Sequence, residues 1–266
     1  AQSELAEEHV ALARAAGAAA RGLLLAVIAA ACAFLAPAEA PAGALLRQDG
    51  LAALWQGLFL AAAVPLVVLM PLASELPAAL VAAALLGMTL LAGANHLILF
   101  FLGLELMSLP SYLLVHALRK DRRALEAAIK YFFAGSVGSG LFLFGVSIFY
   151  SLTGTLAMDP IGVTSPRLEL ALALMGAGAL FKVGAVPLHF WLPDVYEASA
   201  PELAGFFSTG VKAAGLLFLF RVLALLPPAP GGLSSWLPAV SVATMTVGNL
   251  LALRQTSLQR LLAYSS

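Results

Sequence analysis

The amino-acid sequence predicts an all-α polytopic membrane protein. Hydrophobic residues make up 62% of the 266 residues and charged residues 11%, whereas about 25% of the residues in a soluble domain are charged. Apolar runs close to 20 residues long recur along the chain, and about 20 apolar residues are what a helix needs to cross a bilayer. A single soluble core has no use for so many separate apolar runs.

We expect eight membrane-spanning helices and the start of a ninth near Leu258. The predicted spans are residues 20–36, 51–70, 77–93, 96–117, 127–150, 168–190, 203–226 and 236–253. Prolines and glycines separate them, for example in the PPAPGG segment at 227–232. The whole chain, 1–266, is therefore interpreted as a single membrane domain. Because it begins with Ala1 and ends within a starting helix, we expect a fragment of a longer protein.

Charge and cysteine content narrow the chemistry. The formal net charge is zero, so we expect no nucleic-acid partner. Cys32 is the only cysteine in the sequence, which excludes an internal disulfide and a cysteine-based iron–sulfur or zinc site. The sequence contains no glycine-rich phosphate loop with a lysine, no HExxH and no GxSxG motif. We therefore expect no cofactor on this chain and assign any redox chemistry to a partner.

Basic residues predict the orientation in the membrane. The densest basic segment is LRKDRR, which contains four of the 14 lysines and arginines. The positive-inside rule places this loop, 118–126, in the cytoplasm. An acidic segment, Pro193–Glu202, falls on the same side without a basic residue of its own. Whether this acidic segment has a partner is left open.

Three ionisable residues lie inside predicted spans: Glu105, Lys182 and Lys212. A charge at the bilayer centre costs about 2.5–3.5 kcal/mol and marks a functional site by default. Burial and a neighbouring lysine act on Glu105 in opposite directions and can hold it close to the point where it gains and loses a proton. The pattern predicts proton or ion translocation.

Lys182 lies five residues before Pro187, so we expect the helix to break at or just before Val183–Pro187. A broken helix at membrane depth must be buried in protein or line a hydrated cavity, and transporters build ion sites there. His189 follows the proline and is a candidate proton relay. Its alternative is a structural histidine.

Lys212 has apolar sequence on both sides, with Gly210 and Gly215 beside it. The alternative to a proton-carrying role is that the Lys212 side chain snorkels to the membrane surface. Lys130 is a second candidate relay, although a local i,i+4 pair with Glu126 explains it equally well.

The remaining polar and aromatic residues have simpler interpretations. We assign Tyr131, Tyr150, Trp191 and Trp236 to the aromatic belts at the membrane surfaces. Arg221, near a predicted helix end, is interpreted as a snorkelling anchor.

Four segments of the sequence resemble one family. ELMSLPSY (105–112), EAAIKYFFAGSVGSGLFLFGVSIFYSLTGTL (126–156), FKVGAVPLHFWLPDVYEASAP (181–201) and QRLLAYSS (259–266) resemble the antiporter-like membrane subunits of respiratory complex I. SLPSY and PDVY favour the subunit N branch of that family. One departure is the Ala198–Glu202 stretch, where many relatives have a Gly-(Ala/Ser)-Pro-Thr-Pro sequence.

The resemblance implies two inverted helical repeats, each with a broken helix, of which this chain lacks the first helix and the C-terminal repeat. It implies proton translocation by Glu105, Lys182 and Lys212, with Lys130 and Arg260 at further family positions. The enzyme would be a translocating NADH:quinone oxidoreductase of the bacterial inner membrane. Other membrane subunits would be its partners, and NADH, FMN, iron–sulfur clusters and quinone would be bound by partner subunits.

Two alternatives differ in kind. The first is a subunit of a multisubunit cation/proton antiporter of the same superfamily. The second is a purely structural membrane subunit, whose buried charges only lock helices together through paired hydrogen bonds.

Overall fold

A computed structural model describes residues 44–69, 75–159, 165–225 and 236–266 of the chain. The predicted span 20–36, Cys32 and the PPAPGG segment lie outside these residues. The described residues form helices, loops and two isolated β-bridges, Leu46–Ala94 and His96–Ala157. The prediction of an all-α protein is confirmed.

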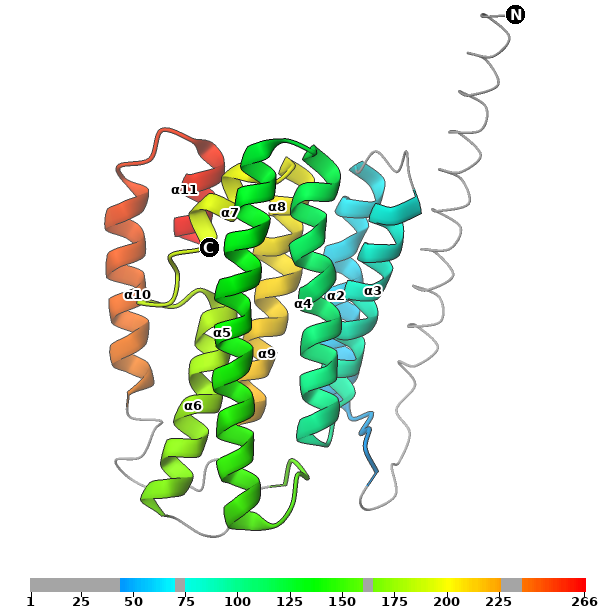
Figure 1. Cartoon of the computed structure of the whole chain (residues 1–266), viewed down its shortest axis with the longest axis vertical. Coiled ribbons are helices and arrows are strands. Elements are labelled where there is room, and N and C mark those ends of the chain that lie inside the picture. Colours follow the sequence, from blue (N-terminus) through cyan, green and yellow to red (C-terminus); the bar gives the residue numbers. More distant parts are fainter. Residues whose placement is uncertain (1–43, 70–74, 160–164, 226–235) are drawn as a thin grey trace, which may run out of the picture.

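The helices run up and down in a bundle (Figure 1). Four long helices come first: α2 (Gly50–Leu69), α3 (Glu75–Gly93), α4 (Leu97–Arg119) and α5 (Arg122–Thr153). Two interrupted helices follow, namely α6 (Pro166–Val183) with α7 (Leu192–Ala198), and α8 (Pro201–Phe206) with the π-helix η1 (Phe207–Val211) and α9 (Lys212–Leu223). The described chain ends with α10 (Leu237–Ala252) and the short α11 (Leu258–Ser265).

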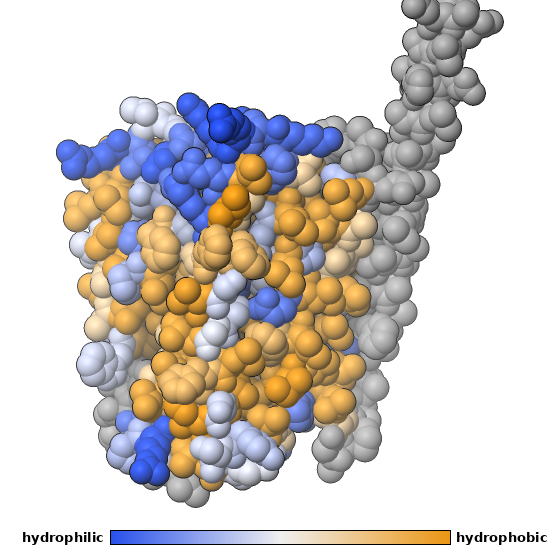
Figure 2. Space-filling view, viewed as in Figure 1, coloured by the Kyte–Doolittle hydropathy of each residue, from blue (hydrophilic) through white to orange (hydrophobic). Residues whose placement is uncertain are grey.

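The surface of the bundle is that of a membrane protein. Among the described residues, five helical segments are long and apolar enough to cross a bilayer: Gly50–Leu69, Leu76–Gly93, Leu97–Arg119, Arg122–Thr153 and Pro201–Leu223. Figure 2 shows a broad hydrophobic band between a strongly hydrophilic end and a second, more mixed end. Large apolar side chains such as Phe133 and Val137 of α5 are about two-thirds exposed, at 64% and 65%. Such exposure in water would be costly, whereas lipid covers it at no cost.

Glycines bring α3 and α4 together. A Cβ at Gly87 would overlap the backbone nitrogen of Met107, and one at Gly103 would lie 2.7 Å from the backbone nitrogen of Leu91. Backbone atoms cannot move aside as side chains do, so only glycine permits this separation. Close approach at small residues is the usual way in which membrane helices gain packing energy without a hydrophobic driving force.

Arg221 corrects a prediction. It does not snorkel to an interface, because only 8% of it is exposed. Its Nη2 donates a hydrogen bond to the carbonyl oxygen of Ala92 at 2.9 Å and lies 3.7 Å from Oδ1 of Asp49. It therefore links α9 to the end of α3 and the start of α2. The error arose because position near a helix end does not reveal whether another chain segment covers that end.

Substituting Gly87 by alanine is expected to lower the free energy of unfolding by about 1–3 kcal/mol, the usual cost of overpacking. The measurement is chemical denaturation of the purified protein in detergent. Gly140→Ala is the control, since a Cβ there meets no atom within 4 Å. Equal losses in both variants would contradict close packing at Gly87.

Asp49 predicts a pH dependence of stability. Partial burial raises the pKa of this carboxyl, but a hydrogen bond from the backbone of Ala52 and the charges of Arg221 and Arg47 outweigh that effect, so the pKa lies below its ordinary value. Its stabilising contribution is therefore present above the unfolded pKa of about 4 and is lost as the pH falls through the folded pKa. Denaturation midpoints of the native protein should fall more steeply below that pH than those of Asp49→Asn. Parallel pH profiles would contradict the assignment.

Candidate functional site

The helix break after Lys182 is present where the sequence predicts it. Helix α6 ends at Val183, and Gly184 adopts a left-handed conformation with φ of 77°. The N–H of Gly184 donates to the carbonyls of Leu180 and Phe181 at 3.0 and 3.1 Å, which closes the last turn. The chain becomes helical again at α7. In Figure 1, α6 lies in the lower half of the bundle and α7 in the upper half.

A neighbouring helix satisfies the backbone exposed by this break. The N–H of Val186 donates to Oγ1 of Thr244 on α10 at 3.1 Å. An unpaired backbone donor at membrane depth costs several kcal/mol. The position of α10 is therefore part of what makes the break tolerable.

Lys182 is the centre of the site. Its side chain belongs to the last turn of α6, where the helix dipole favours a cation, and only 1% of it is exposed. Nζ donates to Oγ of Ser108 at 2.6 Å and to the hydroxyl of Tyr112 at 3.0 Å, both on α4. Lys182 is thus bound by two hydroxyls, of which Ser108 donates its own proton to the carbonyl oxygen of Leu104, whereas Tyr112 can donate as well as accept.

Aromatic rings form a wall around the ammonium group. Nζ lies 5.1 Å from the ring centroid of Tyr112 and 5.9 Å from that of Tyr131, close enough for a cation–π attraction. Tyr131 stacks on Trp191 with centroids 4.2 Å apart and an interplanar angle of 7°. The assignment of Tyr131 and Trp191 to a surface belt is wrong, since they are 0% and 3% exposed. Tyr150 and Trp236 are exposed, as predicted.

Glu105 is half-buried and accepts a hydrogen bond from Oγ of Ser139 on α5. Both Glu105 and Lys182 lie in the described part of the chain, and no ion pair within 4.0 Å joins them. Ser108, one helical turn after Glu105 on α4, is the residue that holds the lysine. The Glu105–Lys182 pair that the family resemblance implies is therefore not a direct contact in this structure.

Lys212 is the second buried lysine, with 8% exposed. It is the first residue of α9, directly after the π-helix η1, which the sequence did not predict. Single-turn π-helices are frequent at functional sites. Its Nζ donates to Oγ of Ser266 at 2.6 Å, so it does not snorkel. A Cβ at Gly215 would lie 3.1 Å from the carbonyl carbon of Lys182, which shows how closely α9 packs on the helix break.

The two candidate relay residues lie elsewhere. Lys130 has a half-exposed side chain and forms ion pairs with Glu126 at 2.8 Å and with Asp194 at 3.2 Å. His189 is half-buried in the turn between α6 and α7, and its ring centroid is 6.4 Å from that of Tyr264. Among the described residues, Nδ1 of His189 has no hydrogen-bond partner.

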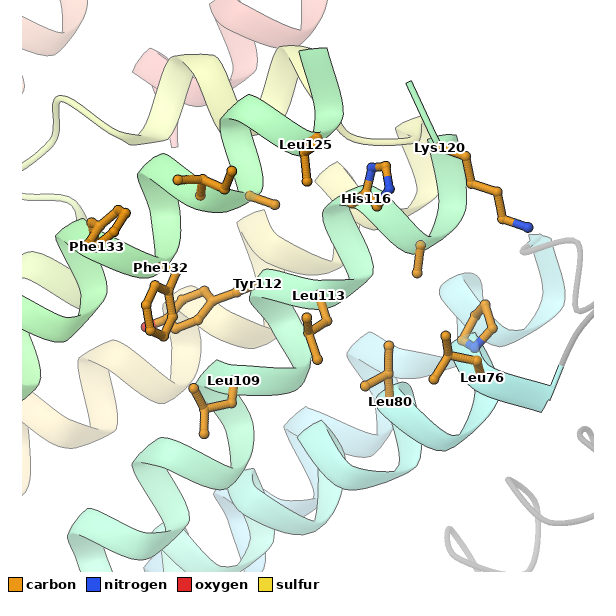
Figure 3. A pocket seen from close by; sticks show the side chains of 14 residues that line it. Leu76, Leu80, Leu109, Tyr112, Leu113, His116, Lys120, Leu125, Phe132 and Phe133 are labelled. Atoms are coloured by element: carbon orange, nitrogen blue, oxygen red, sulfur yellow. The ribbon is translucent and has the colours of Figure 1, made fainter. Parts of the chain in front are cut away.

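An apolar groove of about 1110 Å³ lies on the flank of the site (Figure 3). It opens between α3, α4 and α5, and most of its lining is leucine, isoleucine and phenylalanine. Tyr112 is one of the lining residues, and its hydroxyl contacts Lys182. His116 and Lys120 line the groove further along α4. Tyr112 therefore separates the groove from the buried lysine.

The residues that hold Lys182 were missed as site residues. Glu105, Ser108 and Tyr112 are spaced three and four residues apart, so they share one face of α4. This spacing is visible in the sequence. What it does not reveal is that the broken helix packs against that face.

A membrane bundle with a helix broken beside a buried lysine, and a second buried lysine on the next long helix, defines an antiporter-like membrane protein. The family of NADH:quinone oxidoreductase and Mrp antiporter transmembrane proteins matches residues 94–266. The chain belongs to this family.

Individual relatives agree with this assignment. The chain is 44% identical over 191 residues to NADH-quinone oxidoreductase subunit N 2 of Rhizobium meliloti (strain 1021), covering 69% of this chain and 40% of the relative. It resembles a chain of respiratory complex I from Thermus thermophilus with a TM-score of 0.82 and 35% identity, covering 98% of this chain and 60% of that one. A chain of an archaeal membrane-bound sulfane sulfur reductase follows with a TM-score of 0.79 and 25% identity, covering 98% and 62%. The chain thus spans less than two-thirds of each.

Replacing Tyr112 by phenylalanine is expected to lower the free energy of unfolding by about 1–3 kcal/mol, because a buried ammonium group loses one hydrogen-bond partner. The ring and its packing remain. Thermal or chemical denaturation in detergent measures the change. Tyr150→Phe, at an exposed tyrosine, is the control. A Tyr112→Phe variant as stable as the control would show that the hydroxyl does not support Lys182.

Proposed function

We propose that the chain is part of a proton-translocating membrane subunit of a bacterial NADH:quinone oxidoreductase. The observation that carries the proposal is a lysine, 1% exposed beside a helix break, in a chain 44% identical over 191 residues to a subunit N. Other membrane subunits of the complex are its partners. NADH, FMN, iron–sulfur clusters and quinone belong to partner subunits.

The chemistry at Lys182 suits a group that changes its protonation state. When it is charged, the ammonium donates to Ser108 and Tyr112. When it is neutral, the amine lone pair can accept from the hydroxyl of Tyr112, since a hydroxyl is both donor and acceptor. The Ser108 hydroxyl donates its proton to the carbonyl oxygen of Leu104 and continues to accept from an amine N–H. A direct carboxylate partner would instead hold the lysine charged. The site therefore serves both states with a rotation of the Tyr112 hydroxyl alone.

Glu105 and Lys212 act on Lys182 from two sides in this proposal. Glu105 belongs to the same helix face as Ser108, so a change of its charge alters the field at the lysine. Lys212 lies on the helix that packs on the break at Gly215, and two ammonium groups in one low-dielectric region oppose each other. A proton arriving at one lysine therefore favours release from the other.

The same proposal places the chain in the bacterial inner membrane with loop 118–126 in the cytoplasm. That loop, Arg260 and the acidic segment Pro193–Glu202 share one end of the bundle, the upper end in Figure 1. A basic excess at one end supports this orientation under the positive-inside rule.

Lys182→Met tests the proposal in the full-length protein within the assembled complex. Methionine retains the apolar volume but carries no proton, so proton pumping is expected to fall at least tenfold, and NADH:quinone turnover with it if the steps are obligatorily coupled. Proton pumping and NADH:quinone turnover are both measured in membrane vesicles, each per amount of assembled complex. Lys120→Met, an exposed lysine in the loop after α4, should pump normally. Normal pumping by Lys182→Met would reject the role of this lysine and favour a structural subunit.

The antiporter alternative makes a different prediction. The family description includes Mrp antiporters as well as the quinone oxidoreductases. Sodium/proton exchange by the chain's own complex, in cells that lack the quinone reductase, would favour the antiporter.

A further inference from the structure

Helix α7 is too short to hold its own position. It has seven residues, and isolated helices shorter than about 12–15 residues are marginal. Its charged side chains are acidic, Asp194 and Glu197, and both face cations from other helices. The ion pairs at this end of the bundle are therefore connections between α7 and the rest of the fold.

Two cations converge on these carboxylates. Nζ of Lys130, from α5, lies 3.2 Å from Oδ2 of Asp194. Arg260, from α11, places Nη1 3.3 Å from Oδ1 of Asp194 and 2.7 Å from Oε2 of Glu197. The hydrogen bond to Glu197 raises the pKa of Arg260 above its ordinary value, and a guanidinium is charged at physiological pH even without such a shift. These four residues, Lys130, Arg260, Asp194 and Glu197, are called the α7 clamp.

The α7 clamp is adjacent in sequence to the wall around Lys182. On α5, Lys130 precedes Tyr131, and the residue before α7 is Trp191. These two rings stack at 4.2 Å, with the Tyr131 ring 5.9 Å from Nζ of Lys182. An outward movement of α7 would therefore withdraw Trp191 from behind Tyr131 and open the wall to water.

Through α11, the α7 clamp is also connected to the surroundings of Lys212. Helix α11 carries Arg260 of the clamp, and Nε2 of Gln259 donates to the carbonyl oxygen of Ser199 at 3.1 Å. Ser266, directly after α11, accepts the hydrogen bond from Lys212. Helices α7 and α11 thus form one unit that contacts the surroundings of both buried lysines.

We propose that Lys130 and Arg260 are positioning residues, which hold α7 through Asp194 and Glu197 and thereby keep the aromatic wall closed around Lys182. The proposal rests on the proposed role of Lys182 in translocation. It differs from a relay role for Lys130 because positioning requires only a charge, whereas a relay requires a group that releases its proton. The half-exposed ammonium of Lys130, paired with two carboxylates, fits the first requirement.

Arginine at position 130 separates the two roles. A guanidinium keeps the ion pair with Asp194 but does not deprotonate at physiological pH. Lys130→Arg should therefore retain pumping, and Lys130→Gln should lose it in part. Exposed ion pairs shift local equilibria by up to about fivefold, so a several-fold effect is expected, smaller than that of Lys182→Met.

The experiment uses the assembled complex and two readouts. Proton pumping is measured in vesicles, and backbone hydrogen exchange of the peptide that covers α7 is measured by mass spectrometry, since local opening sets its rate. Lys130→Gln should speed α7 exchange by up to about fivefold and lower pumping, and Lys130→Arg should change neither. Arg122→Gln, at an exposed arginine of the same loop, is the control.

Three outcomes would overturn the proposal. Loss of pumping in Lys130→Arg with unchanged α7 exchange would make Lys130 a proton relay. Unchanged exchange in Lys130→Gln would show that the ion pair does not hold α7. Faster exchange with normal pumping would separate α7 from Lys182. If Lys182→Met itself pumps normally, the proposed function fails, whereas the exchange data still decide whether the clamp holds α7.

Discussion

The burial of one ammonium group is the constraint on which the rest of this structure depends. Lys182 is 1% exposed, and an ion removed from water must find partners inside the protein or give up its charge. Two hydroxyls of α4, the faces of two tyrosines and the carboxyl end of α6 supply those partners. Each partner belongs to a helix that must end or pack at a fixed position relative to Lys182. The positions of α4, α5 and α6 are therefore fixed together.

The helix break follows from the same requirement. Ending α6 directly after Lys182 directs the negative end of its dipole at the lysine. The break leaves backbone groups without helical partners, and Thr244 of α10 supplies one of the replacements. It also creates α7, a short helix held by side chains from α5 and α11. A local solution to an electrostatic problem thus determines how four other helices are arranged.

Charged residues at the ends of the bundle have a different function from charged residues at membrane depth. At the ends of the bundle they form ion pairs, such as those of Asp194 and Asp49, that join elements distant in sequence. At membrane depth the two lysines are held by hydroxyls, and Glu105 accepts from a serine. Hydroxyl partners leave protonation free to change, whereas ion pairs fix it. This division is the one that the proposed role in proton translocation requires.

Local sequence information determined the all-α class, the five described helices that are long and apolar enough to cross a bilayer, the break between Lys182 and Pro187, and the location of two lysines inside the bundle, because hydropathy, proline and charge act within one helix. The partners of these residues required the tertiary structure. Ser108 is 74 residues from Lys182 in sequence, and Trp191 and Arg221 are buried only because other helices cover them. Lys130 reaches Asp194 across 64 residues. A helical pattern shows which residues share a face, but only the packing of helices decides what that face meets.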